Sequence, residues 1–173
     1  MGLIKTFDTK IWCARSVAFD PSGATFASAC GVLIKTWNLD SGECKHTFCG
    51  HSHEVTCLEY FTREDELYLI SGSQDRTAKI WDCHTGRCVR TLKVYSPVRA
   101  VCSHPDLQIL ITGSYNGSVH IWNSTSFRHE RVLKLDLGCV NAIAYLKGST
   151  RVAIGHACGI ELAEIGPEEA IEC

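Results

Sequence analysis

The chain has 173 residues, of which 45% are hydrophobic and 21% are charged, and its formal net charge is −2. This composition is typical of a soluble globular protein with a sizeable core. A charge near zero gives no electrostatic basis for binding nucleic acid, and no apolar run approaches the roughly 18 residues that a membrane span requires. No signal peptide is visible, so we expect a cytoplasmic chain that binds no nucleic acid and does not insert directly into a membrane.

The first segment, residues 3–7, has two interpretations. Met1-Gly2 followed by Thr6 fits an N-myristoylation signal. The same segment (LIKTF) also matches residues 44–48 (CKHTF) and 88–92 (CVRTL), which indicates the outer strand of a repeated unit. The strand interpretation is favoured because the segment recurs.

Four units of strands and turns follow, at residues 12–48, 50–92, 94–135 and 138–165. In the first unit we expect strands near 15–19, 25–29, 33–37 and 44–48. Residues 63–66 (REDE) interrupt the second unit and are interpreted as a charged loop, and Asn116-Gly117 in the third is a strong hairpin signal. Residues 166–173 form an acidic, polar tail.

The second unit contains a recurrent set of polar and aromatic residues. Gly50-His51 precedes a short apolar strand, a Ser-Gly-Ser strand end follows at Ser71, and Asp75 stands six residues before Trp81-Asp82. The set recurs in part, as Thr112, Asn116 and Trp122 in the third unit and as Ser28 and Trp37 in the first. Successive Trp residues are 44 and 41 residues apart, the period of repeats that form propeller blades.

These features resemble a WD repeat, the four-stranded blade of β-propellers. The resemblance implies that His51, Ser71, Asp75 and Trp81 form one buried hydrogen-bonded chain, which is tolerable only when every member is paired. The other units are incomplete: the first lacks the His and the Asp, the third has Val94-Tyr95 in place of Gly-His, and the fourth has no Trp-Asp.

From about Trp37 to Glu169 the sequence is similar to the N-terminal propeller of the coatomer beta-prime family. The similarity is carried by residues 55–61, 67–73 and 77–82, by 104–107, 111–114 and 119–122, and by 151–156 followed by Gly159-Ile160 and 166–169. This resemblance implies a subunit of the COPI vesicle coat, acting in Golgi-to-ER and intra-Golgi transport, peripheral on Golgi membranes. Its implied partners are coatomer subunits or the peptide tails of cargo.

The chain aligns with roughly the second half of that propeller. The family reads dilysine signals mostly with its earliest blades, so no position here inherits that role, and a truncated paralogue is one interpretation. Four blades could close as a small propeller, with residues 3–7 completing the last blade, or could form an arc of a larger one that tends to self-associate.

The sequence gives little support for catalysis, a cofactor or a metal site. Its 11 cysteines contain no C-x-x-C pair, and its eight histidines have no zinc spacing. No nucleophile elbow or phosphate-binding glycine loop is present. We therefore expect structural thiols, no cofactor and no enzymatic activity.

Protein binding is the expected use of such a fold, because propeller loops collect on one face of a rigid scaffold. The residues that we expect to face a partner are Glu54, Gln74, Arg76, Tyr95 and Tyr115. Tyr and Arg are frequent anchors of interfaces. The alternative to a coat protein is a general WD adaptor, such as a ubiquitin-ligase substrate receptor or a signalling scaffold.

Overall fold

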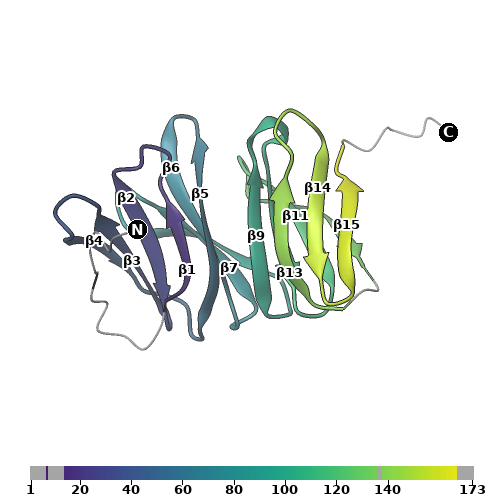
Figure 1. Ribbon diagram of the computed structural model, residues 1–173, viewed down its shortest axis with the longest axis horizontal. Helices are drawn as coiled ribbons and strands as arrows, with labels where there is room; N and C mark the ends of the chain where they lie inside the picture. Colours follow the sequence, from purple (N-terminus) through teal and green to yellow (C-terminus); the bar gives the residue numbers. More distant parts are fainter. Residues whose placement is uncertain (1–6, 8–13, 136–137, 167–173) are drawn as a thin grey trace, which may run out of the picture.

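The computed structural model describes residue 7 and residues 14–135 and 138–166, and this part of the chain is all-β. Its strands form four antiparallel sheets, each built from strands that are consecutive in the chain. The sheets stand side by side like blades (Figure 1). The predicted fold class, an all-β protein of four blades, is confirmed.

Each blade runs from an inner strand to an outer one. The first contains β1 (Ala14–Phe19), β2 (Thr25–Cys30), β3 (Leu33–Asn38) and β4 (Cys44–Phe48). The second contains β5 (Val55–Arg63), β6 (Glu66–Ser73), β7 (Thr77–Asp82) and β8 (Cys88–Lys93). The third contains β9 (Val98–His104), the 3-10 turn η1 (Pro105–Leu107), β10 (Ile109–Ser114), β11 (Ser118–Asn123) and β12 (His129–Lys134), and the fourth contains β13 (Val140–Tyr145), β14 (Arg151–His156) and β15 (Gly159–Glu164).

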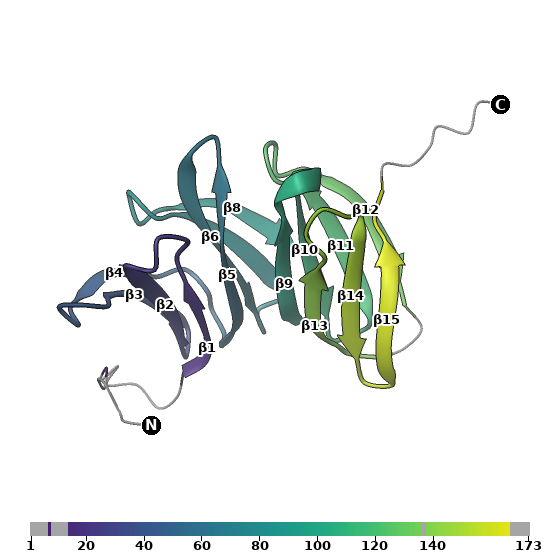
Figure 2. The same ribbon diagram turned by 45° about the horizontal axis from the view of Figure 1, so that its top comes forward.

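The four blades form an open arc. The first and fourth blades lie at opposite ends of the molecule in both views (Figures 1 and 2). The inner strands β1, β5, β9 and β13 contact one another in that order along the arc. Of the two alternatives, closed ring and arc, the structure therefore has the arc.

The hydrophobic core is divided among the three joints between blades. One cluster fills the joint between the first and second blades and includes Phe48 and Trp81. A second cluster joins the second blade to the third, and a third cluster joins the third blade to the fourth. Each blade is thus stabilised mainly by burying its faces against its neighbours, since the hydrophobic effect scales with apolar area removed from water.

A β-bulge recurs at the Trp of the third strand. The pairing with the outer strand shifts between Thr36 and Trp37 in the first blade, and the same shift occurs before Trp81 and before Trp122. A bulge bends a strand and redirects the side chain at that point. The repeat therefore includes the local geometry that turns each indole back towards the second strand.

Two ends of the chain lie largely outside the described residues. Residues 3–6 and 167–173 are not described, so the outer strand at 3–7 and the acidic tail stay predictions. Phe7 is described, and its ring packs edge-on against Trp37 at 6.0 Å between centroids and against Phe26 at 4.8 Å. Phe7 therefore packs against the first blade, on the side away from the second blade.

Nine cysteines are described and all are free thiols. Burial raises the pKa of the thiols of Cys57, Cys83 and Cys102 to about 12. Such thiols stay protonated at neutral pH and behave as small hydrophobic groups. Within residues 14–135 and 138–166, no helix is long and apolar enough to cross a membrane.

Candidate functional site

The second blade contains a continuous chain of four hydrogen-bonded side chains. The Trp81 indole Nε1–H donates to Ser71 Oγ at 2.8 Å, and Ser71 Oγ lies 2.8 Å from His51 Nε2. The other ring nitrogen, His51 Nδ1, lies 2.7 Å from Asp75 Oδ2. With His51 neutral and protonated on Nδ1, every donor in the chain points from Trp81 towards Asp75, and each buried polar group is paired.

The environment favours the neutral form of this histidine. Burial holds the pKa of His51 below its usual value of 6.5, although the adjacent Asp75 acts in the opposite direction. Burial by itself would raise the pKa of Asp75, but hydrogen bonds from Thr77 and His51 outweigh it and lower that pKa below 3.8. The pair therefore consists of a neutral imidazole that donates to a carboxylate.

The first and third blades keep only the Trp end of the chain. Trp37 Nε1 donates to Ser28 Oγ at 2.8 Å, and Trp122 Nε1 donates to Thr112 Oγ1 at 3.1 Å. The first blade makes this contact although its two residues are nine apart, not ten. Asn116 Oδ1 accepts from the backbone N–H and the hydroxyl of Ser118.

The sequence interpretation missed two polar roles that the repeat itself signals. Asp75 accepts from the backbone N–H of Thr77 at 3.0 Å and from its hydroxyl at 2.6 Å, which matches Asn116 and Ser118. The Asp of Trp81-Asp82 accepts from the backbone of His84 and Thr85 and so caps the following turn. A search for Asp or Asn two residues before Thr or Ser would have found the first role.

We expect acid to destabilise the protein in two steps. Below about pH 6.5 the unfolded His51 takes up a proton that the folded side chain resists, so stability falls as the pH falls. Below about pH 3.8 the same argument applies to Asp75, whose ionised form the fold stabilises. The check is the thermal midpoint between pH 8 and 3 for the wild type and for His51→Gln.

The variant should have a lower midpoint at pH 7 and a shallower decline between pH 7 and 5. His120 contributes a decline of the same sign, since burial and the nearby His129 lower its pKa, and His120→Gln measures that share separately. An unchanged slope in His51→Gln would contradict the assignment of a neutral buried imidazole.

The five residues expected to face a partner lie on connections at one end of the blades. Gln74 Nε2 donates to Glu54 Oε2 at 2.9 Å, and the Arg15 guanidinium donates to the other Glu54 oxygen at 2.7 Å. Tyr95 and Tyr115 are 80% and 62% exposed, and the backbone of Val94 bonds to that of Arg76. We call Glu54, Gln74, Arg76, Tyr95 and Tyr115 the loop row.

Arg76 occupies a backbone position that suits glycine. Its φ is +67°, and its carbonyl accepts from Val94 as the carbonyl of Gly117 accepts from Leu135 in the third blade. The equivalent Gly117 has a φ of +84°. A non-glycine residue in this region costs roughly 1–2 kcal/mol, so the second blade holds an exposed cation here against the preference of its backbone.

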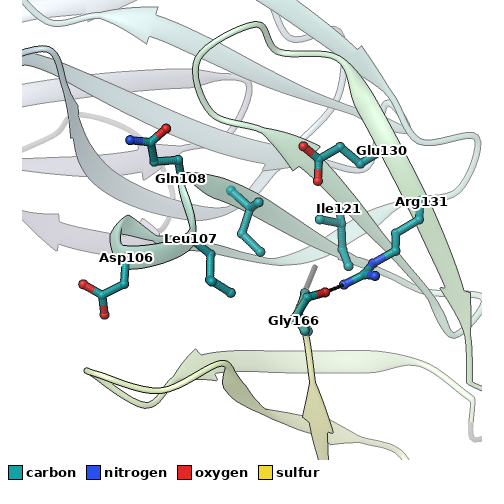
Figure 3. Close-up of a pocket in the computed structure, with 9 residues that line it drawn as sticks. Asp106, Leu107, Gln108, Ile121, Glu130, Arg131 and Gly166 are labelled. Atoms are coloured by element: carbon teal, nitrogen blue, oxygen red, sulfur yellow. Dashed lines mark hydrogen bonds between the residues drawn. The ribbon is translucent and has the colours of Figure 1, made fainter. Parts of the chain in front are cut away.

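A hollow of about 580 Å³ lies at the joint between the third and fourth blades (Figure 3). Asp106, Leu107 and Gln108 line one side, and Glu130 and Arg131 line the other. The Arg131 Nη2 group donates to the carbonyl of Gly166 at 2.8 Å and so holds the chain just after β15. This contact makes Arg131 a structural residue of the joint.

A second hollow, of about 600 Å³, contains residues whose types could indicate hydrolysis, namely Glu59, Ser103 and His104. Burial raises the pKa of Glu59, and its carboxyl accepts from the Ser103 hydroxyl at 2.6 Å. His104 Nε2 instead donates to the carbonyl of Ser149 at 2.9 Å. Serine and histidine therefore bind separate partners and do not form a nucleophile–base pair. No group of three or more metal-binding side chains gathers in the described ranges.

Comparison with known proteins agrees with this geometry. A sequence model of the family described as "WD domain, G-beta repeat" matches residues 42–82 and 86–123, which include the complete polar chain. The chain belongs to the WD-repeat family. It is related to the coatomer beta' subunits: 46% identity to coatomer subunit beta'-1 of Arabidopsis thaliana over 88% of this chain, and 37% to coatomer subunit beta' of Drosophila melanogaster over 95%.

This WD-repeat chain spans 17% and 18% of the lengths of those two relatives. Among solved structures, the crystal structure of the computationally designed Ika4 protein is similar with a TM-score of 0.76, over 89% of this chain and 92% of that one. At 24% identity, this likeness concerns the fold alone.

Proposed function

We propose that this WD-repeat chain is a non-catalytic protein-interaction scaffold of the coatomer type. The main support is its relation to coatomer beta' subunits across most of its length, at 46% identity over 88% of the chain in one case. By this relation it acts in intracellular transport with the COPI coat, between Golgi and ER and within the Golgi. Its location is then the cytoplasm, peripheral on Golgi membranes and vesicles.

The loop row is the surface that we assign to partner binding. Two exposed tyrosines and an arginine provide large contact areas of the kind that anchor protein interfaces. Glu54 is held by Arg15 and Gln74, so this part of the row is ordered before any partner arrives. An ordered surface loses less conformational entropy on binding.

The strained backbone of Arg76 supports this assignment. Glycine suits this positive-φ backbone conformation better, as at Gly117. We therefore expect the cationic side chain of Arg76 to serve binding and not the stability of the fold. The chemistry that fits is an extended peptide or loop of a coat subunit or cargo protein, with a carboxylate or carbonyl for Arg76 and apolar groups for the tyrosines.

The experiment is a binding assay of the purified chain against purified coatomer subunits and cargo-tail peptides. We expect Arg76→Gly to leave the thermal midpoint unchanged or higher and to weaken binding about tenfold or more, the effect of losing roughly 1.4 kcal/mol. Val89→Gly, at an exposed position on β8, is the control and should bind normally. Normal binding by Arg76→Gly would show that the loop row is not part of the interface. A pull-down from cell lysate that returned cullin-linked adaptors and no coatomer subunits would overturn the coat assignment.

A further inference from the structure

The outer face of the fourth blade carries the residues that the other blades bury. Ile160 pairs with Gly155 as Val119 pairs with Gly113, and Leu162 pairs with Ala153 as Ile121 pairs with Ile111. Ile160 and Leu162 are 78% and 77% exposed. Their counterparts Val119 and Ile121 are fully buried under the next blade.

The outer face of the first blade shows the complementary pattern. Val17 pairs with Ser28 as Leu58 pairs with Ser71, and Phe19 pairs with Phe26 as Tyr60 pairs with Leu69. Leu58 and Tyr60 are buried against the preceding blade, whereas Val17 and Phe19 are 61% and 62% exposed. The two ends of the arc are therefore the two halves of an interface that the chain already makes at each internal joint.

Phe7 marks where a preceding blade belongs. Its ring lies 6.0 Å from Trp37 at 67°, and Phe48, the last residue of the outer strand β4, lies 5.5 Å from Trp81 at 63°. Phe7 thus stands against Trp37 as the outer strand of one blade stands against the Trp of the next. In the described residues the fourth sheet has three strands and ends at β15, whereas the other three sheets have four.

We propose that two copies of this chain associate head to tail, the fourth blade of each packing on the first blade of the other. In this arrangement Phe7 of one copy lies at the β15 edge of its partner, where the outer strand of a blade stands at the internal joints. An unpaired strand edge and an exposed apolar face are both liabilities in water, and one contact removes both. Two four-bladed arcs give eight blades, within the roughly four to eight of known propellers. This inference is independent of the proposed function.

The test is light scattering with size-exclusion chromatography on the full chain. We expect a species of about 38 kDa, twice the 19.1 kDa of one chain. Val17→Lys and Leu162→Lys should each give a 19 kDa monomer with an unchanged circular dichroism spectrum, because both side chains are exposed within one copy. Tyr115→Lys, at 62% exposure on the loop row, is the matched control and should stay dimeric.

Mixing the two charge variants distinguishes a head-to-tail contact from a symmetric one. In a dimer of one Val17→Lys chain and one Leu162→Lys chain, one joint contains both lysines and the other joint contains neither. The unaltered joint should allow the mixture to form a dimer at concentrations where neither variant self-associates. A two-fold contact through one patch gives no such recovery. A monomeric wild type, a ladder of species larger than the dimer, or a dimer that survives both substitutions overturns the proposal.

Discussion

Replacing Trp81 by alanine is expected to lower the free energy of unfolding by about 3–5 kcal/mol, the range found for large aromatic side chains removed from cores. Trp81 is 1% exposed, packs against Phe48 of the neighbouring blade and donates to Ser71. The substitution leaves a cavity at a joint between blades and removes one end of the polar chain. Urea denaturation followed by circular dichroism measures the loss.

Two comparison variants separate the packing of Trp81 from its hydrogen bond. Trp81→Phe keeps a ring and loses the N–H donor, so we expect a smaller loss. Trp37→Ala, compared with Trp81→Ala in the monomeric Val17→Lys background, removes an indole at the free end of the arc, where Phe7 is its aromatic neighbour, and should also lose less than Trp81→Ala. An equal loss at Trp37 and Trp81 would show that burial between blades is not what makes Trp81 important.

The repeated spacing of a few residues predicts most of this fold. The same sequence separation stands between Ser71 and Trp81 and between Thr112 and Trp122, and it fixes the register of two neighbouring strands. In each case the structure has the hydrogen bond from the indole N–H to the hydroxyl. The strands of the first blade also agree with expectation to within a residue at each end. Such periodicity is informative because one supersecondary unit is used repeatedly.

Backbone conformations without a residue signature were not predictable. Residues 63–66 were expected to form a charged loop, but β5 runs to Arg63, β6 starts at Glu66, and only Glu64 and Asp65 form the turn. Both have positive φ, which a two-residue hairpin of this kind requires and which usually selects Asn or Gly. The long strands on either side impose the conformation. The same limit hid the left-handed backbone of Arg76, where the residue type gives no warning.

The sequence also did not decide between an open arc and a closed ring. Closure depends on the angle between neighbouring blades, which is set by side-chain volumes at each joint and not by any motif. Gly72 and Gly113 illustrate this dependence. Each faces a valine of the next blade, Val98 and Val140, at a distance that leaves no room for a methyl group.

Gly72→Ala is accordingly expected to destabilise the protein by about 1–3 kcal/mol, the usual effect of overpacking a core. A Cβ at this position would lie 2.4 Å from Val98 Cγ1 and 2.6 Å from Cys57 Sγ, so the second and third blades must move apart. Gly155→Ala in the monomeric Val17→Lys background is the matched control, because it lies at the equivalent place in the fourth blade with no further blade packed on it. There the added carbon would lie 3.6 Å from Ala142 Cβ, an ordinary contact, and urea denaturation should show little change or a small gain.

The first blade indicates how the chain itself accommodates a methyl group at this position. It has Ala29 where the second blade has Gly72, and the residue paired with Ala29 is Ser16, whereas the residue paired with Gly72 is the larger Cys57. The joint thus tolerates one added group when a neighbour is smaller. We expect Cys57→Ala to recover part of the stability lost in Gly72→Ala, as a measured coupling between the two positions. Simple additivity of the two substitutions would show that Val98 alone limits the space between these blades.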